Sequence, residues 1–262
     1  LRPSAPIEDC PRPPAFIEFP RPSSFPAVAF NRSKTYARLE RGGAGIAGRS
    51  AGAAVKYRLA IFDMDGTLAD SFPWFTSVLN SVADKYRFRR VAPDEIETLR
   101  GLSSQQILAW LGVPLWKVPF IARHMRKLKA QRLNDVALFP GVDAMLATLT
   151  ARGVVLAIVS SDTEDNVRRT LGPHNARLIA HYACASGMFD KPKKFRAVLK
   201  RSAIPPAQTI AIGDETRDAE AARAVGAAFG AVSWGYASAA ALQAQAPDLL
   251  FGSIDDIVAR LS

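Results

Sequence analysis

The sequence predicts an α/β protein built on a parallel β-sheet with helices on both faces. Three short apolar runs, at residues 57–62, 154–159 and 208–212, have the length and composition of buried strands. Helical patterns separate these runs, and strands that alternate with helices indicate a parallel sheet covered on both sides. Each run ends in polar side chains, and ligands of open α/β sheets bind beyond the carboxyl ends of the strands.

The alternation continues to the end of the chain. A helix near 141–151 is expected after Phe139-Pro140-Gly141, and it ends before Gly153, because glycine commonly follows the last helical residue. The same reasoning from apolar periods and turn residues gives the remaining elements. We expect helices near 163–171, 194–202, 216–225 and 238–244, strands near 178–183, 228–232 and 248–251, and a closing helix.

The first apolar run ends in the motif Asp63-Met64-Asp65-Gly66-Thr67-Leu68. Side chains two residues apart on an extended chain point the same way, so Asp63 and Asp65 face one site. An aspartate can attack phosphorus and form an aspartyl-phosphate. A second carboxylate beside it can serve as general acid and base. Gly66 permits a tight turn, and Thr67 offers a hydroxyl to a phosphate oxygen.

Three further motifs follow in order. The run 154–159 ends in Ser160-Ser161, and the run 208–212 ends in Gly213-Asp214-Glu215-Thr216-Arg217-Asp218, with Lys191-Pro192-Lys193-Lys194 between them. Together with the first motif, this set resembles the haloacid dehalogenase-like hydrolase superfamily, whose pattern is DxDGTL, a strand ending in Ser or Thr, a Lys, and a strand ending in GDxxxD. The resemblance covers residues 57–262 and implies a Rossmann-like sheet with an added helical cap.

The resemblance also implies roles for the acidic residues. Asp63 is the expected nucleophile, and Asp65 protonates the leaving group and then activates water. A Mg²⁺ ion prefers oxygen ligands, and we expect them from Asp63, Asp214 and the backbone carbonyl of Asp65. Asp218 is expected to bind the metal directly or through water, although an acid in the first turn also suits the helix dipole. The presence of Asp65 favours phosphoryl transfer over dehalogenation.

The phosphate-binding residues come from the other motifs. Ser160 directly follows its strand, as the family hydroxyl does, and we prefer it to Ser161. Lys191 precedes a proline, as the family lysine commonly does, and Lys194 is the alternative. With Thr67, these side chains would neutralise and bind the phosphoryl oxygens.

Residues 72–137 read as helical, with a helix start at Asp70-Ser71-Phe72-Pro73. The family carries its helical cap at this position, which implies a core domain of residues 56–71 and 138–262. Cap closure excludes water from such sites. Arg100, in a break between helices, is a candidate ligand for a substrate carboxylate, with a surface arginine as the alternative.

Other side chains of this helical region are expected to be structural. We expect Trp110, Trp116 and Phe120 in the interior of the cap. A basic stretch around His124, which includes Lys129, is expected to be a solvated helix face.

Residues 1–55 are rich in Pro, Arg and Gly and show neither a helix period nor a strand period. The formal net charge is +10, and residues 1–58 contain ten Lys or Arg against four Asp or Glu. We therefore expect a disordered basic extension, which could be inert, a targeting segment or a binding tail. The remainder contains 24 basic and 20 acidic residues, so its charge is weak evidence for nucleic acid.

These observations favour a Mg²⁺-dependent phosphatase that hydrolyses a small phosphomonoester, phosphoglycolate-like or a sugar phosphate, through an aspartyl-phosphate. The alternatives are a phosphomutase of the β-phosphoglucomutase type, a non-catalytic binding module with the same fold, and a nucleic-acid-binding protein acting through the tail. We expect a small phosphorylated metabolite as partner and no nucleic acid. We also expect no membrane association, since no apolar run reaches about 18 residues. The expected location is cytoplasmic, with organellar targeting by residues 1–55 as the alternative.

Overall fold

A computed structural model of the chain describes residues 56–185, 187 and 190–261. The extension predicted at residues 1–55 lies outside the described residues. All described residues belong to one structural unit. The division into a core of residues 56–71 and 138–262 and a cap of residues 72–137 therefore remains a prediction.

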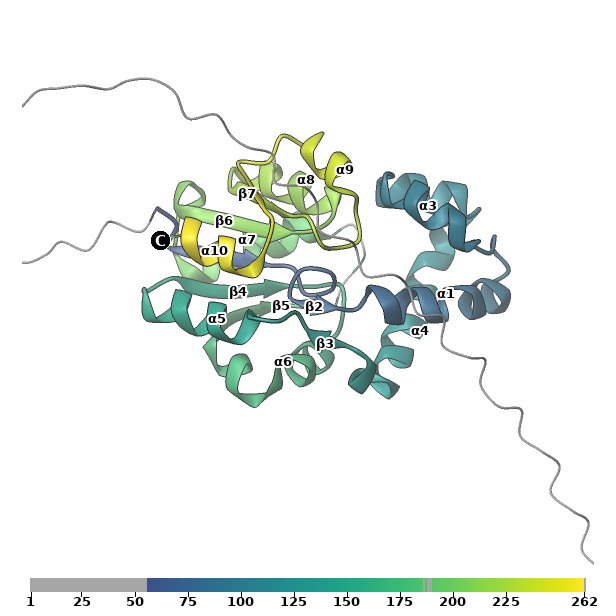
Figure 1. Cartoon of the computed structure of the whole chain (residues 1–262), viewed down its shortest axis with the longest axis horizontal. Helices are drawn as coiled ribbons and strands as arrows, with labels where there is room; N and C mark the ends of the chain where they lie inside the picture. Colours follow the sequence, from purple (N-terminus) through teal and green to yellow (C-terminus); the bar gives the residue numbers. More distant parts are fainter. Residues whose placement is uncertain (1–55, 186, 188–189, 262) are drawn as a thin grey trace, which may run out of the picture. The chain divides into compact units, whose positions relative to one another are not determined.

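The predicted parallel sheet is confirmed (Figure 1). In the described part of the chain, six parallel strands form it in the order β5-β4-β1-β6-β7-β8. The strands are β1 (Leu59–Phe62), β4 (Val155–Val159), β5 (Ile179–Ala183), β6 (Thr209–Gly213), β7 (Ala228–Val232) and β8 (Leu249–Phe251). The three apolar runs at residues 57–62, 154–159 and 208–212 form β1, β4 and β6, which are adjacent strands with β1 in the middle.

The two faces of the sheet bury alternate residues of each strand, because successive side chains point to opposite sides. In β1, Ala60 and Phe62 pack with α5 (Val142–Ala151), α6 (Glu164–Leu178) and α10 (Ile254–Arg260). Leu59 and Ile61 pack on the other face with α7 (Lys191–Ser202), α8 (Thr216–Val225) and α9 (Ala239–Gln243). Helices therefore cover both faces, as the sequence predicts.

The helical region between the first two core strands has its own small core. Its helices are α1 (Phe72–Tyr86), α2 (Ile96–Arg100), α3 (Ser104–Trp110) and α4 (Val118–Gln131), with the 3₁₀ turns η1 (Pro93–Glu95), η2 (Leu115–Lys117) and η3 (Leu133–Asp135). We call residues 72–135 the helical insert. Its buried side chains are Val91, Leu99, Leu111, Val113 and Val118.

The two ends of the helical insert are joined by a short ribbon that the sequence pattern did not reveal. Strand β2 (Ala69–Asp70) pairs antiparallel with β3 (Ala137–Leu138). Two-residue strands are too short to show an alternating pattern, so no period marked them. The ribbon holds the entry and exit of the insert side by side.

The prediction that Trp116 and Phe120 lie in the interior is wrong. They are 67% and 60% exposed, and Trp110 is half-buried under the guanidinium of Arg89. Helix α4 buries Val118 and Lys129, which are three turns apart on one face. Phe120 lies off that face, and its side chain therefore points away from the insert core.

Within the described residues, no helix combines the length and apolar character needed to cross a membrane.

The fold predicts that alanine substitution of two phenylalanines changes the free energy of unfolding by very different amounts. Phe251→Ala, in a fully buried position of β8, should destabilise the protein by about 3–5 kcal/mol through lost burial and a cavity. Phe120→Ala, at an exposed position, should stay within about 0.5 kcal/mol of the parent. Urea unfolding followed by circular dichroism measures both, and equal losses would contradict the placement of these side chains.

Candidate active site

The polar ends of the three central strands meet at one edge of the sheet. Strand β1 pairs in parallel with β4 on one side and β6 on the other. Asp63, Ser160 and Asp214 each follow the last residue of one of these strands. The register therefore brings together side chains that are far apart in the sequence.

Three buried carboxylates form the centre of the site. One carboxylate oxygen each from Asp63, Asp214 and Asp218 lies within 4.8 Å of the others. Asp218 comes from the first turn of α8, where its second oxygen accepts the N–H of Glu215 at 3.1 Å. Lys191, at the start of α7, donates to Asp63 Oδ2 at 2.5 Å and to Asp218.

Opposing forces set the protonation of this cluster. Burial alone raises the pKa of Asp63, but the charges of Lys191 and Arg217 bring the pKa below its ordinary value. Burial raises the pKa of Asp218 to about 6, against the effect of Lys191. Burial lowers the pKa of Lys191, but Asp218 and Asp63 together raise it above the usual value. Both shifts favour the charged forms, so Asp63 and Lys191 form an ion pair.

The third carboxylate, Asp214, has polar partners without a positive charge. It is fully buried, and it accepts the Thr67 hydroxyl at 2.6 Å and the N–H of Tyr236 at 2.7 Å. Burial, followed by the nearby Glu215, Asp63 and Asp218, raises the pKa of Asp214 well above its ordinary value. A bound cation would relieve this repulsion, and an all-oxygen donor set suits a hard cation. The residues present therefore fit a metal ion.

Gly66 lets the first motif approach Asp214 closely. Its φ of +79° is in the left-handed region, and a Cβ there would lie 2.2 Å from Asp214 Oδ2. The turn places the Thr67 hydroxyl on Asp214, whereas the sequence predicts that this hydroxyl binds phosphate. The Thr67 phosphate role remains a prediction.

Asp65 is held by a lysine of the helical insert. Lys129 Nζ lies 2.5 Å from Asp65 Oδ1 and 3.0 Å from Asp162 Oδ2. Burial lowers the pKa of Lys129, but the two carboxylates raise it above the usual value. The prediction of a solvated Lys129 is wrong, because this side chain is only 3% exposed.

The predicted phosphate-binding residues lie beside the cluster. Ser160 is buried, and its hydroxyl accepts the N–H of Asp162 at 3.0 Å. Lys194 donates to the Ser160 carbonyl at 2.5 Å, and burial and the charge of Lys191 lower its pKa to about 8. Lys191, in contrast, contacts Asp63 directly, and the choice between the two lysines remains a prediction.

Arg100 lies at a contact between the helical insert and the loop after β7. Its Nε and Nη2 donate to the carbonyls of Tyr236 and Gly235 at 3.1 and 3.0 Å, and Nη1 pairs with Glu97 at 2.9 Å. The Arg100 carbonyl accepts the N–H of Ser238. These bonds fasten the insert to the loop, and a substrate role for Arg100 remains a prediction.

Sequence reasoning missed three residues of the site: Lys129, Tyr236 and Arg217. Lys129 follows Ile121 and Met125 at four-residue spacing, which is a buried-face signal. Tyr236 follows an ordinary strand without a motif, yet its N–H holds Asp214. Arg217 lies inside the GDxxxD motif, and its guanidinium pairs with Glu215. Of these three residues, only Lys129 has a sequence pattern that indicates its burial.

Comparison with known proteins identifies a matching family and similar proteins. The family described as haloacid dehalogenase-like hydrolase matches residues 60–232. A phosphoglycolate phosphatase of Synechococcus elongatus is 32% identical over 199 residues, which cover 76% of this chain and 94% of the relative. One from Escherichia coli is 25% identical over 230 residues, with coverage of 76% and 90%.

A solved structure has a similar fold. A haloacid dehalogenase-like family hydrolase from Streptococcus pneumoniae superposes with a TM-score of 0.66 at 19% identity. The similarity covers 79% of this chain and 99% of that chain.

The Lys129 bridge predicts a specific loss of stability. Lys129→Met removes the partner of Asp65 and Asp162, and an uncompensated buried charge destabilises by about 3–5 kcal/mol. Lys127→Met, on the exposed side of the same helix, should change stability by no more than about 0.5 kcal/mol. Urea unfolding at pH 7 compares the two variants, and equal stabilities would contradict a stabilising bridge.

Proposed function

The chain belongs to the haloacid dehalogenase-like hydrolase family as a phosphoric monoester hydrolase, and we propose that it hydrolyses a small phosphorylated metabolite with Mg²⁺ through an aspartyl-phosphate. The observation that carries this proposal is the buried carboxylate cluster with Lys191 bonded to Asp63. The remaining roles follow from the contacts of each side chain.

Asp63 is the proposed nucleophile. Its lowered pKa keeps the carboxylate ionised at neutral pH. The N–H of Met64 donates to Oδ1 at 2.8 Å and, with Lys191 on Oδ2, fixes the orientation of the carboxylate. An oriented anion at the sheet edge can attack phosphorus in line with the leaving group.

Asp63, Asp214 and Asp218 are the proposed side-chain ligands of Mg²⁺, with the backbone carbonyl of Asp65 as a further ligand. When bound, the ion neutralises charge on the phosphoryl oxygens and so reduces their repulsion of an anionic nucleophile. Asp214 supports this assignment most directly, because its described side-chain contacts supply hydrogen bonds and no cation.

Asp65 is the proposed general acid and base. In the first step, an Asp63 oxygen bonds to phosphorus while the ester oxygen leaves and takes the proton of Asp65. In the second step, a water oxygen attacks the aspartyl-phosphate and Asp65 takes its proton. The phosphorus bond to Asp63 then breaks and releases inorganic phosphate. Lys129 bonds the ionised Asp65 carboxylate, which is the form that takes the proton from water in the second step.

Ser160 and Lys191 are the proposed phosphate-binding side chains, with Thr67 as a third. Ser160 directly follows β4, the strand beside β1, and Lys191 lies at the start of α7 and bonds Asp63. A positive charge and a hydroxyl beside developing negative charge stabilise the transition state.

We further propose that residues 72–137 act as the cap domain of this enzyme. Two polar contacts join the insert to the catalytic edge. Lys129 bonds Asp65, and Ser104 Oγ donates to Glu215 at 3.1 Å. A cap held by such polar contacts can open for the substrate and close to exclude water.

Asp63→Asn should abolish phosphate release, because an amide is a poor nucleophile. We expect Mg²⁺-dependent release from small phosphomonoesters by the parent, none in EDTA, and a loss of at least about 10³-fold in kcat for the variant. Asp94→Asn, an exposed carboxylate of the insert, is the matched control and should keep full activity. Substantial turnover by Asp63→Asn would refute the nucleophile, and phosphate retained on a sugar would favour a mutase.

The two buried lysines of α7 allow a second test. Lys191→Met should reduce kcat by at least about 100-fold, since it removes the charge beside Asp63. Lys194→Met, one turn further along the helix, should reduce kcat by less than about tenfold, because its ammonium bonds a backbone carbonyl. Steady-state kinetics measure both variants, and circular dichroism checks that they fold. A larger loss of kcat in Lys194→Met than in Lys191→Met would contradict the assignment.

A further inference from the structure

A cavity of about 320 Å³ opens between the helical insert and the catalytic edge of the sheet. Asp65, the proposed acid for the leaving group, is one of its lining residues, whereas the buried Asp63 is not among them. Since the ester oxygen must reach Asp65, the carbon skeleton beyond that oxygen is the part of the substrate that enters this cavity.

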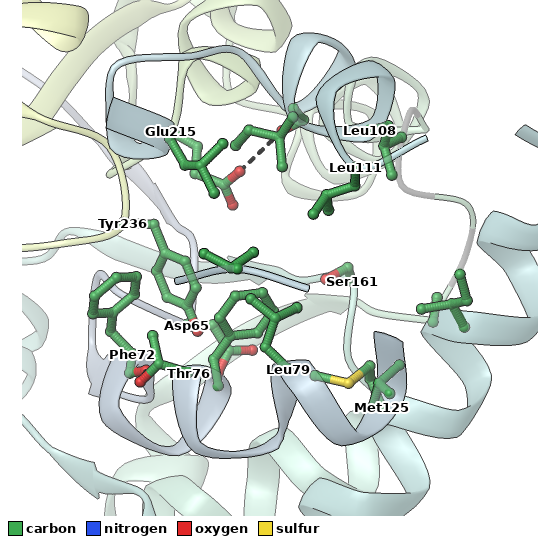
Figure 2. Close-up of a pocket in the computed structure, with 18 of the residues that line it drawn as sticks. Asp65, Phe72, Thr76, Leu79, Leu108, Leu111, Met125, Ser161, Glu215 and Tyr236 are labelled. Atoms are coloured by element: carbon green, nitrogen blue, oxygen red, sulfur yellow. Dashed lines mark hydrogen bonds between the residues drawn. The ribbon is translucent and has the colours of Figure 1, made fainter. Parts of the chain in front are cut away.

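The cavity is polar at one end and apolar along its walls. Figure 2 shows Leu108 and Leu111 facing Leu79 and Met125 across the opening. Helices α1, α3 and α4 supply most of the wall. Its apolar side chains include Leu79, Val82, Ile107, Leu108, Leu111 and Met125. Leu79, Ile107, Leu108 and Met125 are half-buried and line the open space, whereas Val82 and Leu111 are buried behind it.

The cations of the cavity lie at its polar end and already have partners. Lys129 pairs with two carboxylates, Arg217 with Glu215, and Arg100 with Glu97 and two carbonyls. Arg126 donates to the Ser161 carbonyl at 3.0 Å. Beyond this polar end the wall is apolar, and an anionic group that lay along the wall would be an unpaired charge in apolar surroundings, which is strongly unfavourable.

We propose that the substrate is the phosphomonoester of an apolar alcohol, with an aromatic or branched hydrocarbon group bound between α1, α3 and α4. This inference rests on the proposed function and differs from the carboxylate-bearing substrate named for the phosphoglycolate phosphatase relatives. A hydrocarbon group needs no polar partner, and its burial against leucine and methionine side chains is favourable.

The size of the cavity agrees with this class. A cavity of about 150 Å³ holds a benzene molecule, and ligand pockets begin near 300 Å³. The observed volume of about 320 Å³ therefore accommodates a phenyl group with a short linker. A glycolate group is much smaller and would leave most of the wall without contact.

A series of n-alkyl phosphates tests the inference on the unmodified protein. Ethyl, butyl and hexyl phosphate have leaving alcohols of similar acidity, so differences in kcat/KM report binding of the chain. We expect about a fourfold rise in kcat/KM per methylene, the ratio for burial of one CH₂ group, until the cavity is filled. We also expect benzyl phosphate to exceed 2-phosphoglycolate in kcat/KM by at least 100-fold.

Matched leucine variants locate the effect. Leu79→Asn places an amide in the wall and should at least halve the rise per methylene. Leu115→Asn, 69% exposed and outside the cavity lining, should retain the full rise. Leu108→Asn gives the same test from α3 if the first variant does not fold.

The outcomes separate the inference from the proposed function. Mg²⁺-dependent hydrolysis with no dependence on chain length, or with 2-phosphoglycolate as the better substrate, would overturn the apolar-substrate inference and leave the phosphatase mechanism standing. Failure to hydrolyse any ester would overturn both. An equal loss of chain-length dependence in Leu79→Asn and Leu115→Asn would also contradict binding at this wall.

Discussion

The burial of three carboxylates at one edge of the sheet is the constraint on which the surrounding structure depends. Asp63, Asp214 and Asp218 lie close enough to repel one another, and burial strengthens that repulsion. Lys191 reduces it for two of them, and hydrogen bonds from Thr67 and Tyr236 hold the third. The close approach of Gly66, the first turn of α8 and the loop after β7 are all arranged around these oxygens. A structure that did not need the cluster for chemistry would be more stable with apolar side chains here.

The helical insert completes the site through polar contacts at its rim. Lys129 forms ion pairs with Asp65 and Asp162, and Ser104 bonds Glu215. Each contact joins a residue of the insert to a loop at the carboxyl edge of the sheet. Movement of the insert away from this edge would separate Lys129 from Asp65, and the proposed acid would lose the charge that positions it. In the proposed mechanism, closure of the insert over the substrate and the placement of Asp65 are therefore linked.

Local sequence was sufficient for the sheet and for the carboxylates, because short apolar runs and the turns after them are contiguous in the chain. It was insufficient where the outcome depends on tertiary packing. The burial of Lys129 depends on two acids that are 64 and 33 positions away, and the exposure of Trp116 and Phe120 depends on which face of α4 meets the insert core. The β2–β3 ribbon was missed for a different reason, since two residues carry no period.

The difference between contiguous motifs and tertiary packing also applies to substrate choice, which depends on the shape and polarity of the cavity. The proposed catalytic residues need a defined hydrogen-bond geometry, and they therefore lie in short motifs that can be read in the sequence. The wall of the cavity comes from three helices, and any apolar side chain of suitable volume can occupy a wall position without producing a motif. Replacement of Leu79, Leu108 or Met125 by another apolar side chain would therefore leave the carboxylates in place. The leaving group contacts this wall, so two enzymes with one catalytic edge can select alcohols of opposite polarity.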